Sequence, residues 1–167
     1  MIEKEELYSI IPHRGKMMLL TRINEYNLEE RSVDAEYHIT EDCIFYNHSA
    51  CGVPVWAGFE FAAQAIAVLS GLEGRAKGAP AASASSVKPK MGYILSVSSM
   101  KIMLPFFKKN STAHIKVKEI ERMDSVLTFN CIILLEGQIV LQGKLMAMEL
   151  EDEETQKQIM ENRVEQQ

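Results

Sequence analysis

The sequence has no excess of positive charge, few cysteines and few aromatic residues. Its 167 residues carry 18 Lys and Arg against 23 Asp and Glu, a net charge of -5. No basic stripe dominates, which argues against a nucleic acid as the main partner. Cys43, Cys51 and Cys131 are an odd number without metal-type spacing, so we expect no disulfide framework and a reducing, cytoplasmic setting. Nucleotide and metal motifs are also lacking, so no cofactor and no metal are expected.

Long hydrophobic runs are scarce as well, and no secretory signal is expected from the charged and polar first fifteen residues. One stretch, Val53–Leu72, is long enough to resemble a membrane span. It contains Pro54, Gly58, Glu60 and Gln64, and a central charge alone costs roughly 2.5–3.5 kcal/mol on insertion. We therefore predict a core helix and no membrane span.

The remaining composition, 47% hydrophobic and 25% charged, is that of one soluble globular domain. We assign residues 1–150 to this domain and residues 151–167 to a charged tail. The expected elements are a helical turn at Lys4–Ile11, an apolar run at Met17–Glu25, a strand at Arg31–Ile39, a long helix from about Val55 to Leu72, a loop at Glu73–Lys90, and strands at Met91–Val97, Ser99–Leu104, Thr112–Glu121, Ser125–Leu135 and Gln138–Leu150. The first two of these last five strands could be one continuous strand.

The order of elements indicates the fold class. A helix that is apolar nearly all round must be enclosed, and an antiparallel sheet can curl around it and bury one face there. The sequence therefore predicts an α+β protein of the hotdog type, an antiparallel sheet wrapped around a long central helix.

Two segments resemble a known family. IIPHRGKMMLLTRI (Ile10–Ile23) resembles the LPHRxPxLLVDRV opening of the bacterial 3-hydroxyacyl-ACP dehydratases, and EFAAQ (Glu60–Gln64) matches the E-x-x-A-Q piece of their central helix. Pro54 precedes Glu60 by 60 − 54 = 6 residues, as in that family. The resemblance covers about Ile10 to Met148. GVPVWAGFEFAAQAIA is more similar still to the dehydratase-like proteins of aryl-polyene lipid gene clusters.

The resemblance implies a 3-hydroxyacyl-ACP dehydratase, which forms a trans-2-enoyl thioester in fatty acid or aryl-polyene-type lipid synthesis. It implies that His48 and Glu60 are catalytic and meet across the interface of a homodimer or hotdog heterodimer. The implied partner is acyl carrier protein or an acyl-CoA thioester. The sequence departs from the family in two places. The family histidine precedes the acid by fourteen residues, whereas His48 precedes Glu60 by 60 − 48 = 12 residues. In addition, Val55 stands where the family has a helix-starting glycine.

The chemistry accounts for these residue types. Removing a proton beside a thioester carbonyl suits an imidazole, and expelling hydroxide needs an acid. A carboxyl group in an apolar pocket keeps its proton because desolvation raises its pKa, while the positive end of a helix acts in the opposite direction. Burial must outweigh the helix terminus if Glu60 is to act as the acid.

The start of the helix is expected to bind substrate. Its free N–H groups could hold the thioester oxygen, with the N–H of Val55 as the expected donor. Gln64 lies one turn after Glu60 and is expected to order it. The expected cavity is shaped by Trp56, Phe59 and residues of the strands around Tyr93 and Pro105.

Other interpretations remain open. A hotdog thioesterase would use Glu60 to activate water, and a noncatalytic subunit would bind an acyl chain or a partner without turnover. Glu60 could also be a first-turn residue that favours the helix dipole, and His48 an ordinary loop histidine. Cys51 lacks the orienting third group that a thiol nucleophile needs.

The remaining histidines and the basic residues are assigned other roles. We expect His13 to brace the N-terminal turn, and His38 and His114 to lie in solvent. An acidic acyl carrier protein needs a basic landing site. The candidates are Arg75, Lys77, Lys88, Lys90, Lys108 and Lys109.

Overall fold

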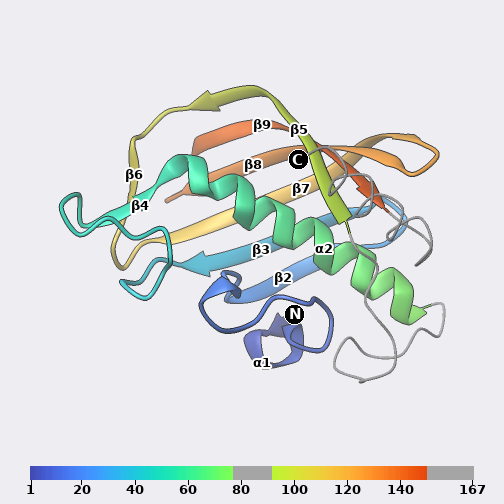
Figure 1. Cartoon of the computed structure of the whole chain (residues 1–167), viewed down its shortest axis with the longest axis horizontal. Coiled ribbons are helices and arrows are strands. Elements are labelled where there is room, and N and C mark those ends of the chain that lie inside the picture. The colour runs from blue at the N-terminus through green and yellow to red at the C-terminus, as the bar shows by residue number, and fades with distance from the viewer. Residues whose placement is uncertain (77–91, 150–167) are drawn as a thin grey trace, which may run out of the picture.

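The computed structural model describes residues 1–76 and 92–149. A seven-stranded antiparallel sheet curls around one long helix, α2 (Gly58–Ala76), as Figure 1 shows. The strands of this sheet, in spatial order, are β1 (Ile2–Glu3), β2 (Arg22–Asn27), β3 (Ser32–His38), β7 (Thr112–Met123), β8 (Val126–Leu135), β9 (Gln138–Glu149) and β5 (Gly92–Ile102). The predicted α+β hotdog fold is confirmed.

Several shorter elements complete the fold. Helix α1 (Lys4–Leu7) and the 3₁₀ turn η1 (Gly15–Met17) belong to the N-terminal segment, and the 3₁₀ turn η2 (Val55–Ala57) leads into α2. Strands β4 (Gly52–Pro54) and β6 (Phe106–Lys108) pair as a separate small sheet. The sequence patterns indicated neither this small sheet nor β1, because two- and three-residue strands carry almost no periodic signal.

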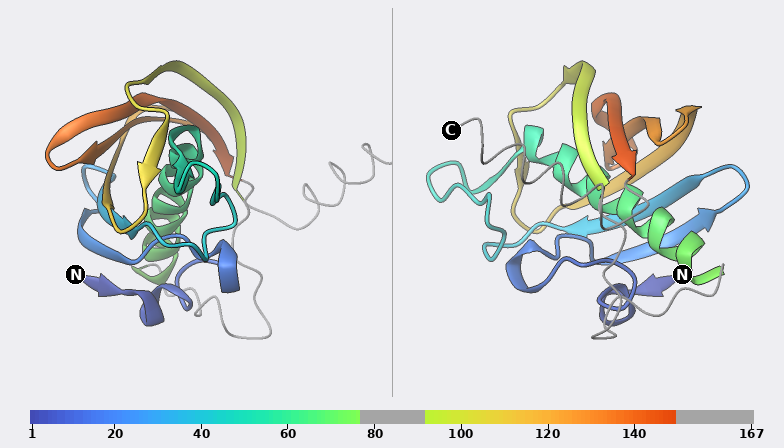
Figure 2. Two further views of the ribbon diagram at one scale, coloured as in Figure 1. Left: turned by 90° about the vertical axis from the view of Figure 1, so that its left-hand side faces the viewer. Right: turned by 45° about the vertical axis from the view of Figure 1, so that its right-hand side comes forward.

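Helix α2 lies in the concave face of the sheet, and the left view of Figure 2 shows the strands curving around it. The ring of Phe61 packs edge-on against Tyr37 at 4.7 Å between centroids and lies 5.8 Å from Phe107. The segment Val55–Ala76 is long and apolar enough to cross a membrane, but 67% of its apolar window is buried inside the protein. Its hydrophobicity is accounted for by its enclosure in the core.

The alternating pattern of the strands is realised as predicted. Buried side chains of β3 stand opposite buried side chains of β7 in the pairs Val33–Val117, Ala35–Ile115 and Tyr37–Ala113. His38 and His114 fall on the other face, where both are exposed or half-exposed. The expectation of a solvated histidine is confirmed for His38, whereas His114 is half-exposed and its Nδ1 lies 3.4 Å from Glu36 Oε1.

Helix α2 continues past the expected end at Leu72. Its described part reaches Ala76, and its last turn has partners in other segments: Glu73 pairs with Arg31, and Arg75 Nη2 donates to Ser9 Oγ at 2.5 Å. The alternative of one continuous strand over 91–97 and 99–104 is confirmed: β5 is a single strand, with register irregularities between Ile94 and Ser96 and between Ser98 and Lys101. The tail at 151–167 and most of the loop at 73–90 lie outside the described residues.

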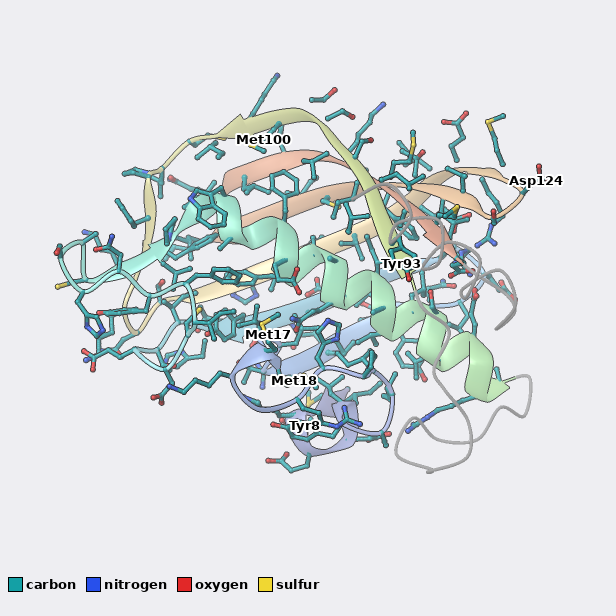
Figure 3. All side chains as sticks on the ribbon, in the orientation of Figure 1. Tyr8, Met17, Met18, Tyr93, Met100 and Asp124 are labelled. Carbon is teal, nitrogen blue, oxygen red and sulfur yellow. The ribbon has the colours of Figure 1, made fainter. Side chains whose placement is uncertain are left out.

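Strand β5 forms one edge of the sheet. It pairs with β9 and has no second neighbour among the described strands. It is exposed along nearly its whole length (Figure 3 labels Tyr93 and Met100 on it). The exposed apolar side chains of β5 and the turn after it are Ile94, Leu95, Val97, Met100, Ile102, Met103 and Leu104.

Candidate active site

A buried glutamine joins α2 to the N-terminal segment. Gln64 is fully buried; its Oε1 accepts from the backbone N–H of Leu19 at 3.0 Å, and its Nε2 donates to the carbonyl of Met17 at 2.8 Å. The loop of the labelled Met17 and Met18 lies beside α2 in Figure 3. Because only the oxygen can accept from an N–H, the Leu19 bond fixes which end of the amide is which.

The same amide holds Glu60. Gln64 Nε2 donates to Glu60 Oε1 at 3.0 Å, one helical turn away. The Glu60 side chain is 32% exposed, so the carboxyl group is fixed at one oxygen and still open to solvent. The expectation that Gln64 orders Glu60 agrees with this contact. A catalytic role for Glu60 stays a prediction.

The histidine beside Glu60 in its own chain is His13. Its Nε2 lies 3.8 Å from Glu60 Oε1, and its side chain is 24% exposed. Its other ring nitrogen, Nδ1, is buried without a hydrogen-bond partner among the described residues. Burial lowers the pKa of His13 below its usual 6.5; the nearby Glu60 carboxylate opposes this shift and Arg14 adds to it. His13 is therefore a neutral imidazole at pH 7.

Arg14 fixes the turn that carries His13. Its Nη1 donates at 2.7 Å to the carbonyl oxygens of Ile11 and His13, and its guanidinium lies over the ring of Tyr8 at 5.7 Å. Arg14, rather than His13 as expected, therefore braces this turn, and His13 lies beside Glu60 of α2 instead. The sequence held one hint of the contact between His13 and Glu60: His13 lies in the N-terminal segment that resembles the dehydratases. The spacing along the chain did not point to Glu60 as its neighbour.

His48 lies elsewhere in the same chain. It is exposed on the turn between Asn47 and Gly52, whose backbones exchange two hydrogen bonds, and its ring packs edge-on against Tyr46 at 5.1 Å. No hydrogen bond or ion pair joins His48 to Glu60 within the part of the chain that the structure describes. A catalytic His48 would have to act on the Glu60 of another subunit, and this role stays a prediction.

The predicted substrate-binding residues occupy three environments. Val55 is fully buried, and its N–H donates to the carbonyl of Pro105 at 3.1 Å, so it is not free to bind a thioester oxygen in this conformation. Trp56 is 54% exposed and packs against Phe45. Phe59 is buried against Gly143, where an added Cβ would lie 3.0 Å from the ring.

Of the six basic residues expected to form a landing site for acyl carrier protein, some are already paired and some lie outside the described residues. Lys77, Lys88 and Lys90 lie outside the described residues. Arg75 is engaged by the hydroxyl of Ser9 and lies 3.8 Å from Glu6, and Lys109 Nζ donates to Glu41 at 2.5 Å. Lys108 is exposed on β6.

The three cysteines are free, two of them buried and Cys51 exposed. Burial raises the pKa of the Cys131 thiol to about 12, so it is protonated at pH 7. Across residues 1–76 and 92–149, no three His, Cys, Asp or Glu side chains are grouped so that they could hold a metal ion.

A protein-family model for ApeP dehydratase, of the ApeP-like group, matches residues 5–159. The chain belongs to the ApeP-like dehydratase family. It is also 35% identical over 74 residues to the 3-hydroxyacyl-[acyl-carrier-protein] dehydratase FabZ of Chlamydia caviae, a match that covers 42% of this chain. The chain spans about half (48%) of the length of that curated relative.

Solved structures agree on the fold of this ApeP-like chain. It resembles a chain of the dehydratase heterocomplex ApeI:P from Xenorhabdus doucetiae, with a TM-score of 0.77 at 20% identity over 92% of this chain and 96% of that one. It also resembles a hypothetical thioesterase with coenzyme A from Streptococcus pneumoniae, with a TM-score of 0.56 at 11% identity over 87% and 95% of the two chains. At these identities the likeness establishes a common hotdog fold and no shared reaction.

Proposed function

We propose that this ApeP-like protein is a 3-hydroxyacyl-[acyl-carrier-protein] dehydratase of fatty acid or aryl-polyene-type lipid synthesis in the cytoplasm. The observation that carries the proposal is the Glu60 carboxyl group, held at Oε1 by the fully buried Gln64 and open to solvent over 32% of its side chain. A carboxyl group anchored at one oxygen and accessible at the other suits a proton donor. Membership of a dehydratase family supports the same reaction.

In the proposed reaction, a base removes a proton from C2 of the 3-hydroxyacyl thioester. The electron pair of that C–H bond forms the C2=C3 double bond as the C3–O bond breaks. The departing hydroxide takes the proton of Glu60 and leaves as water. The base is His48 from a second subunit, because the His48 of the same chain is exposed and has no contact with Glu60 among the described residues.

A second hotdog subunit is accordingly part of the proposal. Strand β5 is an edge strand with one neighbour in the described sheet, and apolar side chains are exposed on and after it. An exposed apolar edge strand is a ready template for pairing with another chain. We assign β5 to the contact between subunits of a homodimer, the assembly in which His48 of a second copy meets Glu60. In a hotdog heterodimer, like the complex to which the fold is similar, the other chain would supply the base instead.

The partner substrate is an acyl thioester carried on acyl carrier protein or coenzyme A. An acidic carrier protein would approach a basic residue near the site. Lys108 is the described candidate that is exposed and has no ion pair with another described residue. Replacing Lys108 with glutamate should raise the KM for the carrier-bound substrate and leave the KM for the coenzyme A ester unchanged.

The decisive experiment uses the purified protein and 3-hydroxyacyl thioesters of several chain lengths, and follows the absorbance of the enoyl thioester. Wild type should form enoyl product, while release of free thiol would indicate a thioesterase instead. Glu60→Gln keeps the size of the side chain but removes the transferable proton, so it should fold normally and turn over at least ~10²-fold more slowly. A folded Glu60→Gln protein with a near-normal rate would exclude Glu60 as the acid.

Subunit mixing tests the shared site. His48→Ala should lower the rate by roughly 10²–10⁴-fold, the range for a positioned general base. After unfolding and refolding together, Glu60→Gln and His48→Ala chains form mixed dimers with one intact site. Random assortment should then restore roughly a quarter of the wild-type rate. No recovery would mean that the two residues do not act across an interface.

One observation favours a second candidate function, that of a noncatalytic subunit. The N–H of Val55, the expected donor to the thioester oxygen, is bound to the carbonyl of Pro105. A subunit of this kind would bind an acyl chain or an active hotdog partner. It would show tight binding without enoyl formation in the same assay.

A further inference from the structure

The two carboxyl oxygens of Glu60 have different neighbours. Gln64 Nε2 donates to Oε1, and His13 Nε2 lies 3.8 Å from the same oxygen. No hydrogen bond to Oε2 occurs among the described residues. Hydrogen bonds at active sites are often long before substrate binds and shorten in the complex, so 3.8 Å leaves room for a bond between His13 and Oε1.

The tautomer of His13 follows from its buried nitrogen. If Nδ1 carried the proton, a buried N–H would have no acceptor, whereas a bare Nδ1 leaves only an unused lone pair. An imidazolium would bury the same unpaired N–H together with a charge. The proton therefore belongs on Nε2, the nitrogen that faces Glu60.

The two donors reach Glu60 from one rigid support. Gln64 ties the backbones of Met17 and Leu19 to α2, and Arg14 holds the carbonyl of His13. The loop that carries His13 is therefore docked on the helix at the turn next to Glu60. Since both N–H groups converge on Oε1, that oxygen can only accept, and the carboxyl proton is left to Oε2.

We propose that His13 is a positioning residue for Glu60: as a neutral Nε2–H donor it holds Oε1 together with Gln64, so that Oε2 carries the proton delivered to the substrate. This role rests on the proposed dehydratase function and adds a residue to it. His13 makes no covalent or acid–base step of its own. The base that removes the C2 proton remains His48 of the second subunit.

The role predicts a specific pattern of rescue. The amide nitrogen of glutamine can replace Nε2 of histidine, and the shorter asparagine can replace only Nδ1. His13→Leu should lower kcat by about tenfold, the equivalent of one hydrogen bond, with KM nearly unchanged. His13→Gln should restore most of the rate and His13→Asn should not. His38→Ala, on the exposed face of β3, is the matched control and should leave the rate unchanged.

The pH profile separates this role from a purely structural one. The charged groups that act on His13 in the described residues are Glu60 of α2 and Arg14 of its own turn. Protonation of His13 at Nδ1 leaves the Nε2–H donor in place but adds a positive charge beside Glu60. That charge favours the ionised carboxylate over the acid that the reaction needs, so the acidic limb of the kcat profile should contain this group. In His13→Gln that component should vanish. A uniform loss of rate at every pH, without rescue by glutamine, would overturn the proposal.

A measurement without substrate keeps the two proposals distinguishable. Long-range ¹H–¹⁵N spectra of the imidazoles should show His13 in the Nε2–H tautomer near neutral pH. A Nδ1–H tautomer would refute the contact even in an active enzyme. If the spectra agree but wild type forms no enoyl product, the dehydratase function fails and the His13–Glu60 contact stands.

Discussion

Replacing Gln64 with methionine tests the contact on which the candidate site depends. The two side chains have similar size, but methionine lacks the amide. The N–H of Leu19, a residue only 1% exposed, then loses its acceptor. The carbonyl of Met17 loses a donor, although its surroundings are only partly buried and water can replace the bond.

The expected loss of stability follows from these two groups. A buried donor left without a partner costs about 1–3 kcal/mol, and a carbonyl that regains water costs less. Gln64→Met should therefore lower the free energy of unfolding by about 2–4 kcal/mol, a large fraction of the ~5–15 kcal/mol of a typical domain. With a slope of ~2 kcal/mol per molar urea, the middle of the usual range, the midpoint should fall by about 1–2 M.

The assay is urea unfolding at fixed protein concentration, because subunit association would otherwise change the midpoint. Gln138→Met, at an exposed position at the start of β9, is the control and should stay within about 0.5 kcal/mol of wild type. Gln64→Glu adds a directional test, since its carboxylate would face Glu60 Oε1 and should be tolerated better at low pH. A Gln64→Met protein as stable as the control would show that the hydrogen bonds of Gln64 to Leu19 and Met17 do not stabilise the contact between the N-terminal segment and α2.

Three further outcomes are expected. Gly71→Ala should lower the Tm by several degrees, because its Cβ would lie 2.4 Å from the backbone oxygen of Ile10. Gly92→Ala is the control and should not lower the Tm, because the nearest atom to its Cβ would be 4.0 Å away. Equal Tm values for the two variants would contradict the close packing at Gly71. Val97→Lys on the exposed edge of β5 should shift the mass in light scattering from dimer toward monomer, and an unchanged dimer would place the subunit contact elsewhere. Burial lowers the pKa of His13 in the folded protein, so its contribution to stability is intact above pH 6.5 and is lost as the pH falls below that value. His13→Gln should therefore flatten the curve of unfolding free energy against pH in this range. Parallel curves for wild type and variant would rule out this contribution of His13.

Much of this fold could be predicted from local patterns. Alternation in Arg31–Ile39 and Thr112–Glu121 identified two strands and the correct buried face of each, because the side-chain period of a strand is a local property of the backbone. The apolar stretch from Val55 identified the central helix, since a helix without a polar face must be enclosed. The i, i+4 spacing of Glu60 and Gln64 likewise predicted that their side chains meet.

Only the tertiary structure decided what surrounds Glu60. Gln64 bonds to a backbone N–H 45 residues away, and this contact brings His13, rather than His48, to the carboxyl group of the same chain. The pairing of Val55 N–H with Pro105 spans 105 − 55 = 50 residues and was equally hidden. Helical and strand periods report which face of an element is buried, but not which distant backbone group will satisfy a buried donor. That choice is made by the packing of the whole chain, where each buried polar group must find a partner.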